Sequence, residues 1–238
     1  MDLTNNNTQL FMLHFGGGNR YSFQFIKPYL PVNFDFQPIE LPGRGKRINE
    51  PLLSTEQECV NDLFSQIISL RNKRPYLIYG HSMGASLGLR ITKRLEEIGD
   101  PPKRLIVSGN AGPGTGSNKR RSQMNDEELK EELRLLGGVS EEVLSNDDLF
   151  NFFSPIMRSD FKLLENSEKL GPDFMIKSSI VAIMGDKEET SGEIENWKNF
   201  SLGEFKFHLL PGNHFFIHDH PVELMKIIKN AYDRPLVS

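Results

Sequence analysis

The chain has 238 residues, of which 37% are hydrophobic and 25% charged, and its formal net charge is −4. This balance is typical of a globular protein with one substantial core, and the negative charge argues against a nucleic-acid partner, which would need a basic surface. Cys59 is the only cysteine, which excludes an internal disulfide and a thiolate metal cluster. Because the sequence shows no signal peptide and no membrane-spanning run, we expect a cytoplasmic protein without membrane contact.

Strand-like and helix-like segments alternate along most of the chain. Strands are predicted at Gln9–Phe15, Phe34–Leu41, Pro75–Tyr79, Arg104–Ser108, Ser178–Met184 and Glu204–Leu210. Amphipathic helices are predicted at Ser54–Leu70, which opens with a capping box at Ser54 or Thr55, at Ala85–Ile98 and from Pro221 onward. This alternation favours an α/β fold in which helices cover both faces of a mainly parallel sheet.

The alternation is interrupted between the fourth and fifth predicted strands, where only helices are expected. These helices are predicted at Asp126–Leu136, Ser140–Leu144, Asp147–Phe153 and Ser159–Leu170, the last two separated by Pro155. We expect them to form a helical lid, approximately residues 112–172, inserted into a single domain that spans residues 1–238.

A serine between two glycines follows the third predicted strand, in the segment Gly80-His81-Ser82-Met83-Gly84. A strand, this segment and then a helix are the pattern of a nucleophile elbow, in which the serine sits on a tight turn and its hydroxyl projects above the sheet. Small neighbours let the backbone pass through that turn. Five residues also match ordinary turns by chance, so the prediction depends on partner residues elsewhere.

A serine nucleophile needs a histidine as base and a carboxylate that orients the histidine. In folds with this elbow the chain order is serine, acid, histidine, and His214 lies in the loop after the last predicted strand, where it could reach Ser82. The loop after the fifth predicted strand, Gly185-Asp186-Lys187-Glu188-Glu189, offers three carboxylates. The residues alone leave the choice among these carboxylates open.

The other histidines are expected to have structural roles. His81 is next to Ser82, but adjacent side chains diverge on a turn, so we expect it to pack or to form a hydrogen bond. His218 and His220 flank Asp219, yet no further carboxylate or cysteine cluster accompanies them, so we predict no metal site.

Several segments together resemble the type II thioesterases, the stand-alone editing hydrolases of nonribosomal peptide and polyketide synthesis, which have the α/β-hydrolase fold. Phe11–Gly18 is similar to that family's first strand and glycine loop, Leu41–Gly45 to its Leu-Pro-Gly-Arg-Gly turn, and Gly80–Gly84 to its elbow. In the lid, Leu136–Gly138 and Pro155–Phe161 are similar to its Leu-Gly-Gly and Leu-Arg-Ala-Asp-Phe segments.

The resemblance implies an enzyme that hydrolyses acyl thioesters through an acyl-serine intermediate, with Ser82 and His214 as catalytic residues and no cofactor. By position in the family's motif, Glu188 inherits the role of the acid, although the family usually has an aspartate there, and Asp186 is the fallback. The backbone N–H groups of Met83 and Gly16 would form the oxyanion hole.

The resemblance also implies a partner, an acyl- or peptidyl-carrier protein that bears a phosphopantetheine thioester, and we expect the enzyme to be a monomer. Candidates for lining the acyl cavity are Phe15, Phe153, Met157 and Phe161. Aromatic side chains at helical spacing are also common in plain cores. Candidates for docking an acidic carrier are Lys119, Arg120 and Arg121, for which a solvated loop is the alternative.

Three other functions remain open at this point. A carboxylesterase or lipase of the same fold would prefer oxygen esters, and an acyltransferase or cyclase would deliver the acyl group to an amine or alcohol. A catalytically silent carrier-binding module would use the fold only as a scaffold.

Overall fold

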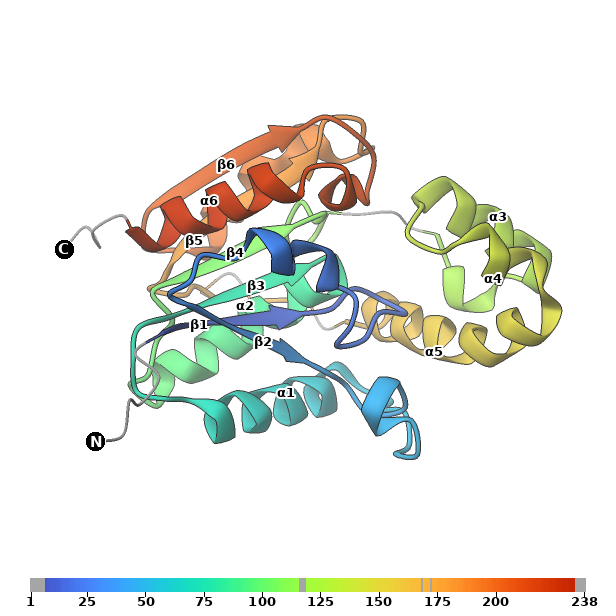
Figure 1. The fold of residues 1–238 in the computed structure, drawn as a ribbon, viewed down its shortest axis with the longest axis horizontal. Coiled ribbons are helices and arrows are strands. Elements are labelled where there is room, and N and C mark those ends of the chain that lie inside the picture. Colours follow the sequence, from blue (N-terminus) through green and yellow to red (C-terminus); the bar gives the residue numbers. More distant parts are fainter. Residues whose placement is uncertain (1–6, 116–118, 168, 172, 234–238) are drawn as a thin grey trace.

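A six-stranded parallel sheet forms the centre of the molecule (Figure 1). The computed structural model describes residues 7–115, 119–167, 169–171 and 173–233. The strand order is β2-β1-β3-β4-β5-β6, and every neighbouring pair is parallel. The strands are β1 (Thr8–Leu13), β2 (Phe34–Ile39), β3 (Tyr76–His81), β4 (Arg104–Ser108), β5 (Ser179–Gly185) and β6 (Phe205–Leu210). Because all six run the same way, the loops at their carboxyl ends meet at one edge of the sheet.

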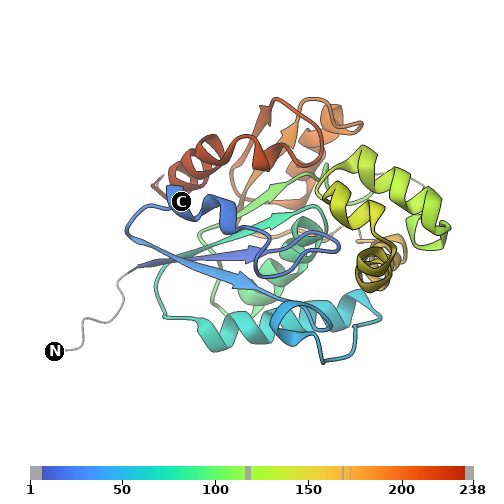
Figure 2. The same ribbon diagram turned by 45° about the vertical axis from the view of Figure 1, so that its right-hand side comes forward.

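Helices cover both faces of the sheet (Figures 1 and 2). On one face lie α1 (Glu56–Leu70) and α2 (Met83–Glu97), and on the other lie α6 (Pro221–Asp233) and the 3₁₀ helix η1 (Gln24–Tyr29). Three further 3₁₀ helices in this part of the chain are η2 (Gly45–Arg47), η4 (Ser191–Phe200) and η5 (Phe216–His218). The predicted fold class, a mainly parallel sheet between helical layers, is confirmed.

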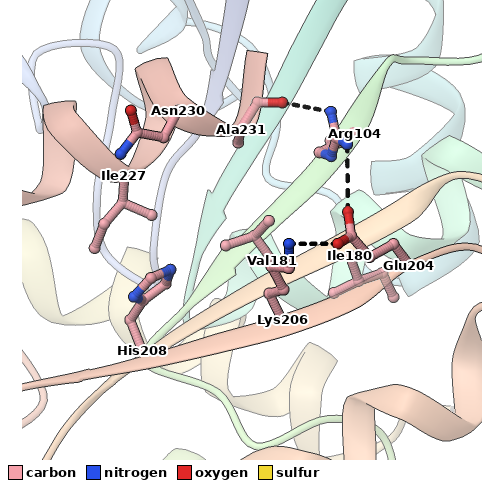
Figure 3. Close-up of a pocket in the computed structure, with 9 residues that line it drawn as sticks. All are labelled: Arg104, Ile180, Val181, Glu204, Lys206, His208, Ile227, Asn230 and Ala231. Atoms are coloured by element: carbon pink, nitrogen blue, oxygen red, sulfur yellow. Dashed lines mark hydrogen bonds and ion pairs between the residues drawn. The ribbon is translucent and has the colours of Figure 1, made fainter. Parts of the chain in front are cut away.

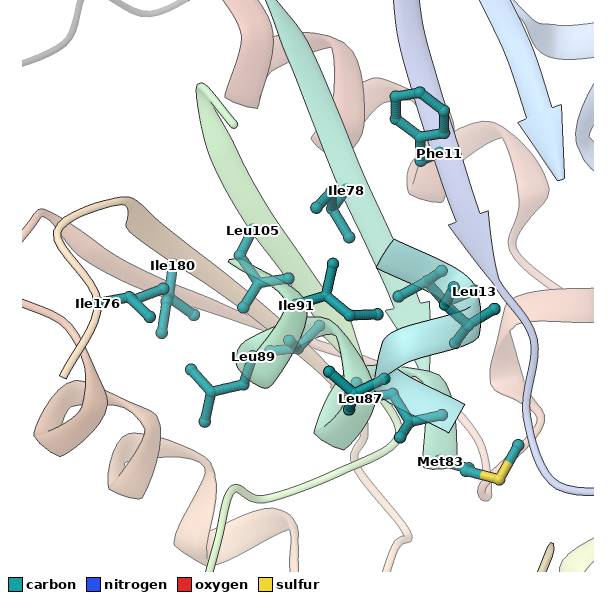
Figure 4. Packing of buried hydrophobic residues seen from close by; sticks show 14 of the residues in the cluster. Phe11, Leu13, Ile78, Met83, Leu87, Leu89, Ile91, Leu105, Ile176 and Ile180 are labelled. Atoms are coloured by element: carbon teal, nitrogen blue, oxygen red, sulfur yellow. The ribbon is translucent and has the colours of Figure 1, made fainter. Parts of the chain in front are cut away.

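Alternation along the strands divides the core into two layers. In β1, Phe11 and Leu13 pack with α1 and α2, whereas Leu10 and Met12 pack with α6, and none of the four is more than 1% exposed. Successive side chains of a strand point to opposite faces, so a strand covered on both sides is apolar throughout. Figure 4 shows part of the layer between α2 and the sheet.

The amino end of α1 decides between the two predicted capping boxes. Thr55 accepts a hydrogen bond from the Glu58 N–H, and the Glu58 carboxylate accepts one from the Thr55 N–H. The capping box therefore starts at Thr55 and not at Ser54, and it satisfies two N–H groups that the helix leaves unpaired.

The interrupting helices lie together beyond the carboxyl ends of the strands (Figure 2). They are the 3₁₀ helix η3 (Arg121–Gln123), α3 (Asp126–Leu136), α4 (Glu141–Ser145) and α5 (Asp147–Glu165). They bury a small hydrophobic cluster of their own, made of Leu129, Leu133, Leu144, Phe150 and Met157. A separate cluster of this kind is what an inserted lid needs, and we keep the name lid for these helices.

One lid prediction was wrong, because the two helices expected on either side of Pro155 are a single helix. α5 runs from Asp147 to Glu165 with Pro155 inside it. A proline inside a helix removes one hydrogen bond and costs about 3 kcal/mol. The helix continues because Phe150 and Met157, on either side of the proline, are both buried in the lid cluster, and this burial offsets the cost.

Candidate active site

Ser82 occupies the tight turn between β3 and α2. Its φ of 54° and ψ of −112° lie outside the regions that non-glycine residues favour. The turn is tight because a Cβ added to Gly80 would lie 2.1 Å from the Gly84 carbonyl oxygen, and one added to Gly84 would lie 2.2 Å from the Leu13 carbonyl oxygen. The Ser82 N–H donates to the Ser108 carbonyl at 2.8 Å. Both glycines of the motif are thus required by backbone contacts, as a nucleophile elbow demands.

His214 and Glu188 are joined by a hydrogen bond of 2.8 Å between Nδ1 and Oε2. Glu188 lies in the loop after β5 and His214 in the loop after β6. The other carboxylate oxygen of Glu188 accepts the Gly185 N–H at 2.8 Å, which fixes the side chain against its own loop. In a neutral imidazole that donates Nδ1–H to a carboxylate, Nε2 carries no proton and can act as a base.

Asp186, the fallback acid, makes a different contact. Its side chain accepts the Gly212 N–H at 2.9 Å. The loops after β5 and β6 come so close that a Cβ added to Gly185 would lie 2.3 Å from the Gly212 carbonyl oxygen. Asp186 thus ties the two loops together, whereas Glu188 contacts the imidazole.

His81, which precedes Ser82 in the elbow, lies next to His214 in the loop after β6. Its ring centroid lies 5.1 Å from that of His214, and its Nδ1 is 2.8 Å from the Ser108 hydroxyl, which in turn is 2.6 Å from the Tyr79 hydroxyl. Complete burial lowers the pKa of His81 well below its usual value, so the ring is neutral. His81 therefore packs and forms a hydrogen bond, as predicted.

Ser82 and His214 lie on the same edge of the sheet, at the carboxyl ends of β3 and β6. No hydrogen bond joins the Ser82 hydroxyl to the His214 ring within the described residues. Catalytic hydrogen bonds are often long without substrate and tighten when it binds. The arrangement thus brings a serine, a histidine and a hydrogen-bonded carboxylate, the side chains that serine-based acyl transfer uses, to one edge of the sheet.

Two backbone segments flank Ser82. Met83 is the first residue of α2, so its N–H belongs to the unpaired amino end of that helix. Gly16 lies in the loop that follows β1, and the backbone just before this loop passes against Gly84. The neighbouring Gly17 N–H donates to Asp160 at 2.7 Å and is therefore already engaged.

The residues predicted to line an acyl cavity fall into two groups. Phe15 is buried in the main domain, where it makes edge-to-face contacts with Phe23, His81 and Phe215. Phe153, Met157 and Phe161 pack in the lid cluster. Phe15 is therefore next to the histidines, and the lid residues share a core.

The predicted docking cluster is divided by ion pairs. Lys119 and Arg121 both contact Glu132 of α3, at 2.8 Å and 2.7 Å. Arg120 is exposed and makes no ion pair to a described residue. Two of the three positive charges are thus paired with a carboxylate of the lid itself.

Two cavities lie apart from Ser82. A hollow of about 40 Å³ lies between α6 and the strands β4, β5 and β6 (Figure 3). It includes Arg104, which starts β4 at the opposite end of the sheet from Ser82 and donates to the Ala231 carbonyl. A hollow of about 460 Å³ lies on the lid and is lined by Arg120, Ser122, Gln123, Pro155, Arg158, Ser159, Lys162, Glu165 and Asn166.

Two features are absent from the described part of the chain. It contains no group of three or more His, Cys, Asp or Glu side chains that could hold a metal ion. None of its helices has both the length and the apolar character needed to cross a bilayer.

Comparison with known proteins places the chain in a family. The family model described as a thioesterase domain matches residues 8–232, which include the elbow, the acid loop and the histidine loop. The chain belongs to the thioesterase family. It is therefore an enzyme of this class, and the resemblance found in the sequence is confirmed.

Individual relatives of this thioesterase match nearly its whole length. Linear gramicidin dehydrogenase LgrE of Brevibacillus parabrevis, whose name states another activity for that protein, is 28% identical, and the match covers 96% of this chain and 89% of LgrE. The structure of ClbQ from the colibactin NRPS/PKS pathway is 27% identical, with a TM-score of 0.88 and coverage of 95% and 97%. The type II thioesterase BorB from the borrelidin biosynthetic cluster is 28% identical, with a TM-score of 0.83 and coverage of 94% and 92%.

No role was predicted for Arg44 or Asp160 from the sequence, although both lie in segments that resemble the family. The signal was the position of Asp160 within the lid segment Pro155–Phe161 and of Arg44 within the turn Leu41–Gly45. Their contact joins residues 116 positions apart, which local patterns do not reveal.

Proposed function

We propose that this thioesterase removes stalled acyl groups from the phosphopantetheine arm of carrier proteins in nonribosomal peptide or polyketide synthesis. Membership of the family and similarity to proteins named for such pathways, ClbQ and BorB, support this substrate class. The observation that carries the chemistry is the His214–Glu188 hydrogen bond of 2.8 Å at the sheet edge that also bears the Ser82 elbow.

In the proposed reaction, His214 Nε2 takes the proton of Ser82 as Oγ attacks the thioester carbonyl. Glu188 holds the imidazole in the tautomer with a proton on Nδ1 and stabilises the imidazolium that forms. The oxyanion is held by the N–H groups of Met83 and Gly16. His214 then protonates the departing thiolate, a good leaving group because the pKa of a thiol is about 8.5.

Deacylation repeats these steps with water as the nucleophile. His214 removes a proton from the water as it attacks the acyl-serine carbonyl, and the same two N–H groups hold the second oxyanion. His214 then returns the proton to Ser82 Oγ. The products are the carboxylic acid, the carrier thiol and the free enzyme.

Trapping of the acyl-enzyme tests the assignment of the nucleophile. Wild type mixed with a short acyl-CoA and quenched within milliseconds should show one added acyl group by intact mass, and peptide mapping should place it on Ser82. Ser82→Ala should show no added mass. An acyl group found on another residue, or on both proteins equally, would contradict the proposal.

A further inference from the structure

Asp160 is a carboxylate of the lid that is completely buried. It lies in α5, has no exposed surface, and forms a bidentate ion pair with Arg44 at 2.5 Å and 2.9 Å. Arg44 belongs to the loop after β2, and its side chain is only 4% exposed. The pair therefore joins the lid to the rest of the domain in a buried environment.

The same carboxylate also holds the loop that follows β1. Asp160 Oδ2 accepts the Gly17 N–H at 2.7 Å, and the guanidinium of Arg44 donates to the Gly18 carbonyl at 3.4 Å. The loop is thus held at Gly17 by the Asp160 carboxylate and at Gly18 by the Arg44 guanidinium. Gly16, the proposed oxyanion donor, immediately precedes these two anchored residues.

Helix α5 packs closely against this loop and leaves no room for a side chain at Gly17. Gly17 has a φ of +75°, and a Cβ added to it would lie 2.7 Å from Met157 Cγ. A Cβ on Gly16 would lie 3.6 Å from Asp160 Cβ. The path of the loop is therefore shaped directly by two residues of α5 that are one helical turn apart.

The energetics argue that the pair does more than add stability. Removing two charges from water is costly, and apolar side chains of similar volume are often as stabilising as a buried ion pair. A carboxylate that accepts a backbone N–H and a guanidinium at once fixes direction as well as distance, which an apolar contact does not. Orientation is what an oxyanion donor requires, because it must already point at the site of the developing charge.

We infer that Asp160 is a positioning residue for the oxyanion loop, so that α5 sets the direction of the Gly16 N–H toward Ser82. The lid is then a part of the catalytic apparatus and not only a cover over the acyl chain. Arg44 serves by holding the Asp160 carboxylate in place. This inference rests on the proposed function, because it takes the loop after β1 to supply an oxyanion donor.

The test compares Asp160→Asn with wild type on a short acyl-CoA and on a p-nitrophenyl ester, with active sites counted by titration. We expect kcat to fall at least about tenfold on both substrates while KM changes less than about twofold, because a misdirected donor weakens transition-state binding. The affinity for an alkyl trifluoromethyl ketone, which forms a tetrahedral adduct with the serine, should fall by a similar factor. Affinity for the carboxylic acid product should not change.

Asp100→Asn provides a control that also removes the carboxylate of an arginine pair, although Asp100 is 37% exposed and Asp160 is buried. Asp100 also forms a bidentate ion pair with an arginine, Arg71, at 2.8 Å and 2.9 Å. Asp100 lies in the loop after α2, at the opposite end of the sheet from Ser82. We expect this variant to lower the melting temperature without changing kcat per titrated site. A purely structural role of Asp160 predicts the same behaviour for both variants.

Arg44→Lys covers the case in which Asp160→Asn does not fold. It keeps a positive charge beside Asp160 and loses the second hydrogen bond to the carboxylate. Both kcat and ketone affinity should therefore fall, while KM stays unchanged. Unchanged kcat and ketone affinity in the folded variants, or a change confined to KM, would overturn the inference. A wild type that binds the ketone but hydrolyses no thioester would refute the proposed substrate instead, and ketone affinity would still decide the role of Asp160.

Discussion

At the scale of single residues, Glu188 shows how the site accommodates a side chain one methylene longer than aspartate. The Glu188 N–H donates to the Gly185 carbonyl at 3.1 Å, and its carboxylate returns to the Gly185 N–H, so the loop closes on itself. This tight turn lets the other oxygen reach His214 at 2.8 Å. The side chain is 7% exposed, and the contact is therefore shielded from water.

Substitutions in the acid loop test which carboxylate orients the base. Glu188→Gln should lower kcat by at least about a hundredfold, because an amide does not hold the imidazole in the required tautomer or stabilise the imidazolium. Asp186→Asn should lower kcat less than about threefold, since its side-chain oxygen can still accept the Gly212 N–H. Turnover per titrated site measures both effects. The opposite ranking would assign the role to Asp186.

A buried histidine predicts how stability depends on pH. His14 Nδ1 lies 2.8 Å from the Phe15 carbonyl, and its Nε2 accepts the Leu41 N–H at 3.3 Å, so the ring must be neutral. Burial, followed by the charge of Arg44, lowers its pKa from 6.5 to about 4, although Asp160 and the Phe15 carbonyl act in the opposite direction. The unfolded chain therefore binds the proton first as pH falls.

The contribution of His14 to stability should thus be complete above about pH 6.5 and be lost as pH falls toward 4, a loss of about 3 kcal/mol. His14→Gln, whose amide can make both hydrogen bonds, should remove that part of the slope. Urea unfolding at several pH values measures the difference. Parallel profiles for the two proteins would show that His14 does not titrate in this way.

At the scale of elements, the lid shows where sequence patterns succeed and where they fail. The absence of strand patterns between residues 109 and 170 correctly indicated helices, because period-2 and period-3.6 patterns differ clearly. Pro155 led to a helix break in the prediction, whereas the helix continues because tertiary burial of Phe150 and Met157 outweighs local propensity. Local rules therefore identify the helices of the lid but not their lengths.

The ion pairs of Lys119 and Arg121 with Glu132 narrow the predicted docking cluster to Arg120. Arg120→Glu should raise the KM for a carrier-bound thioester about threefold or more and leave that for acyl-CoA unchanged, because Arg120 is the residue whose charge is free of Glu132. Arg121→Glu should instead lower the melting temperature, since it places two carboxylates together. Steady-state kinetics and thermal unfolding separate the two effects. Equal effects of Arg120→Glu on both substrates would contradict a docking role.

At the scale of the whole molecule, the fold followed from the sequence because apolar strands and amphipathic helices alternate regularly. The parallel sheet then brings the loops that bear Ser82, Glu188 and His214 to one edge, where Glu188 and His214 form a hydrogen bond. Contacts such as Arg44 with Asp160 join segments whose separate patterns do not reveal each other. Such contacts depend on how the lid packs against the sheet, which needs the three-dimensional structure.

The central claim is that the enzyme hydrolyses carrier-bound thioesters through Ser82. The most direct test measures thiol release from a short acyl-phosphopantetheinyl carrier protein beside the matched acyl-CoA and p-nitrophenyl ester, for wild type and Ser82→Ala. We predict serine-dependent release with the highest kcat/KM for the carrier-bound thioester. Activity confined to the oxygen ester would contradict the claim and indicate an esterase, and equal release by Ser82→Ala would contradict the role of the serine.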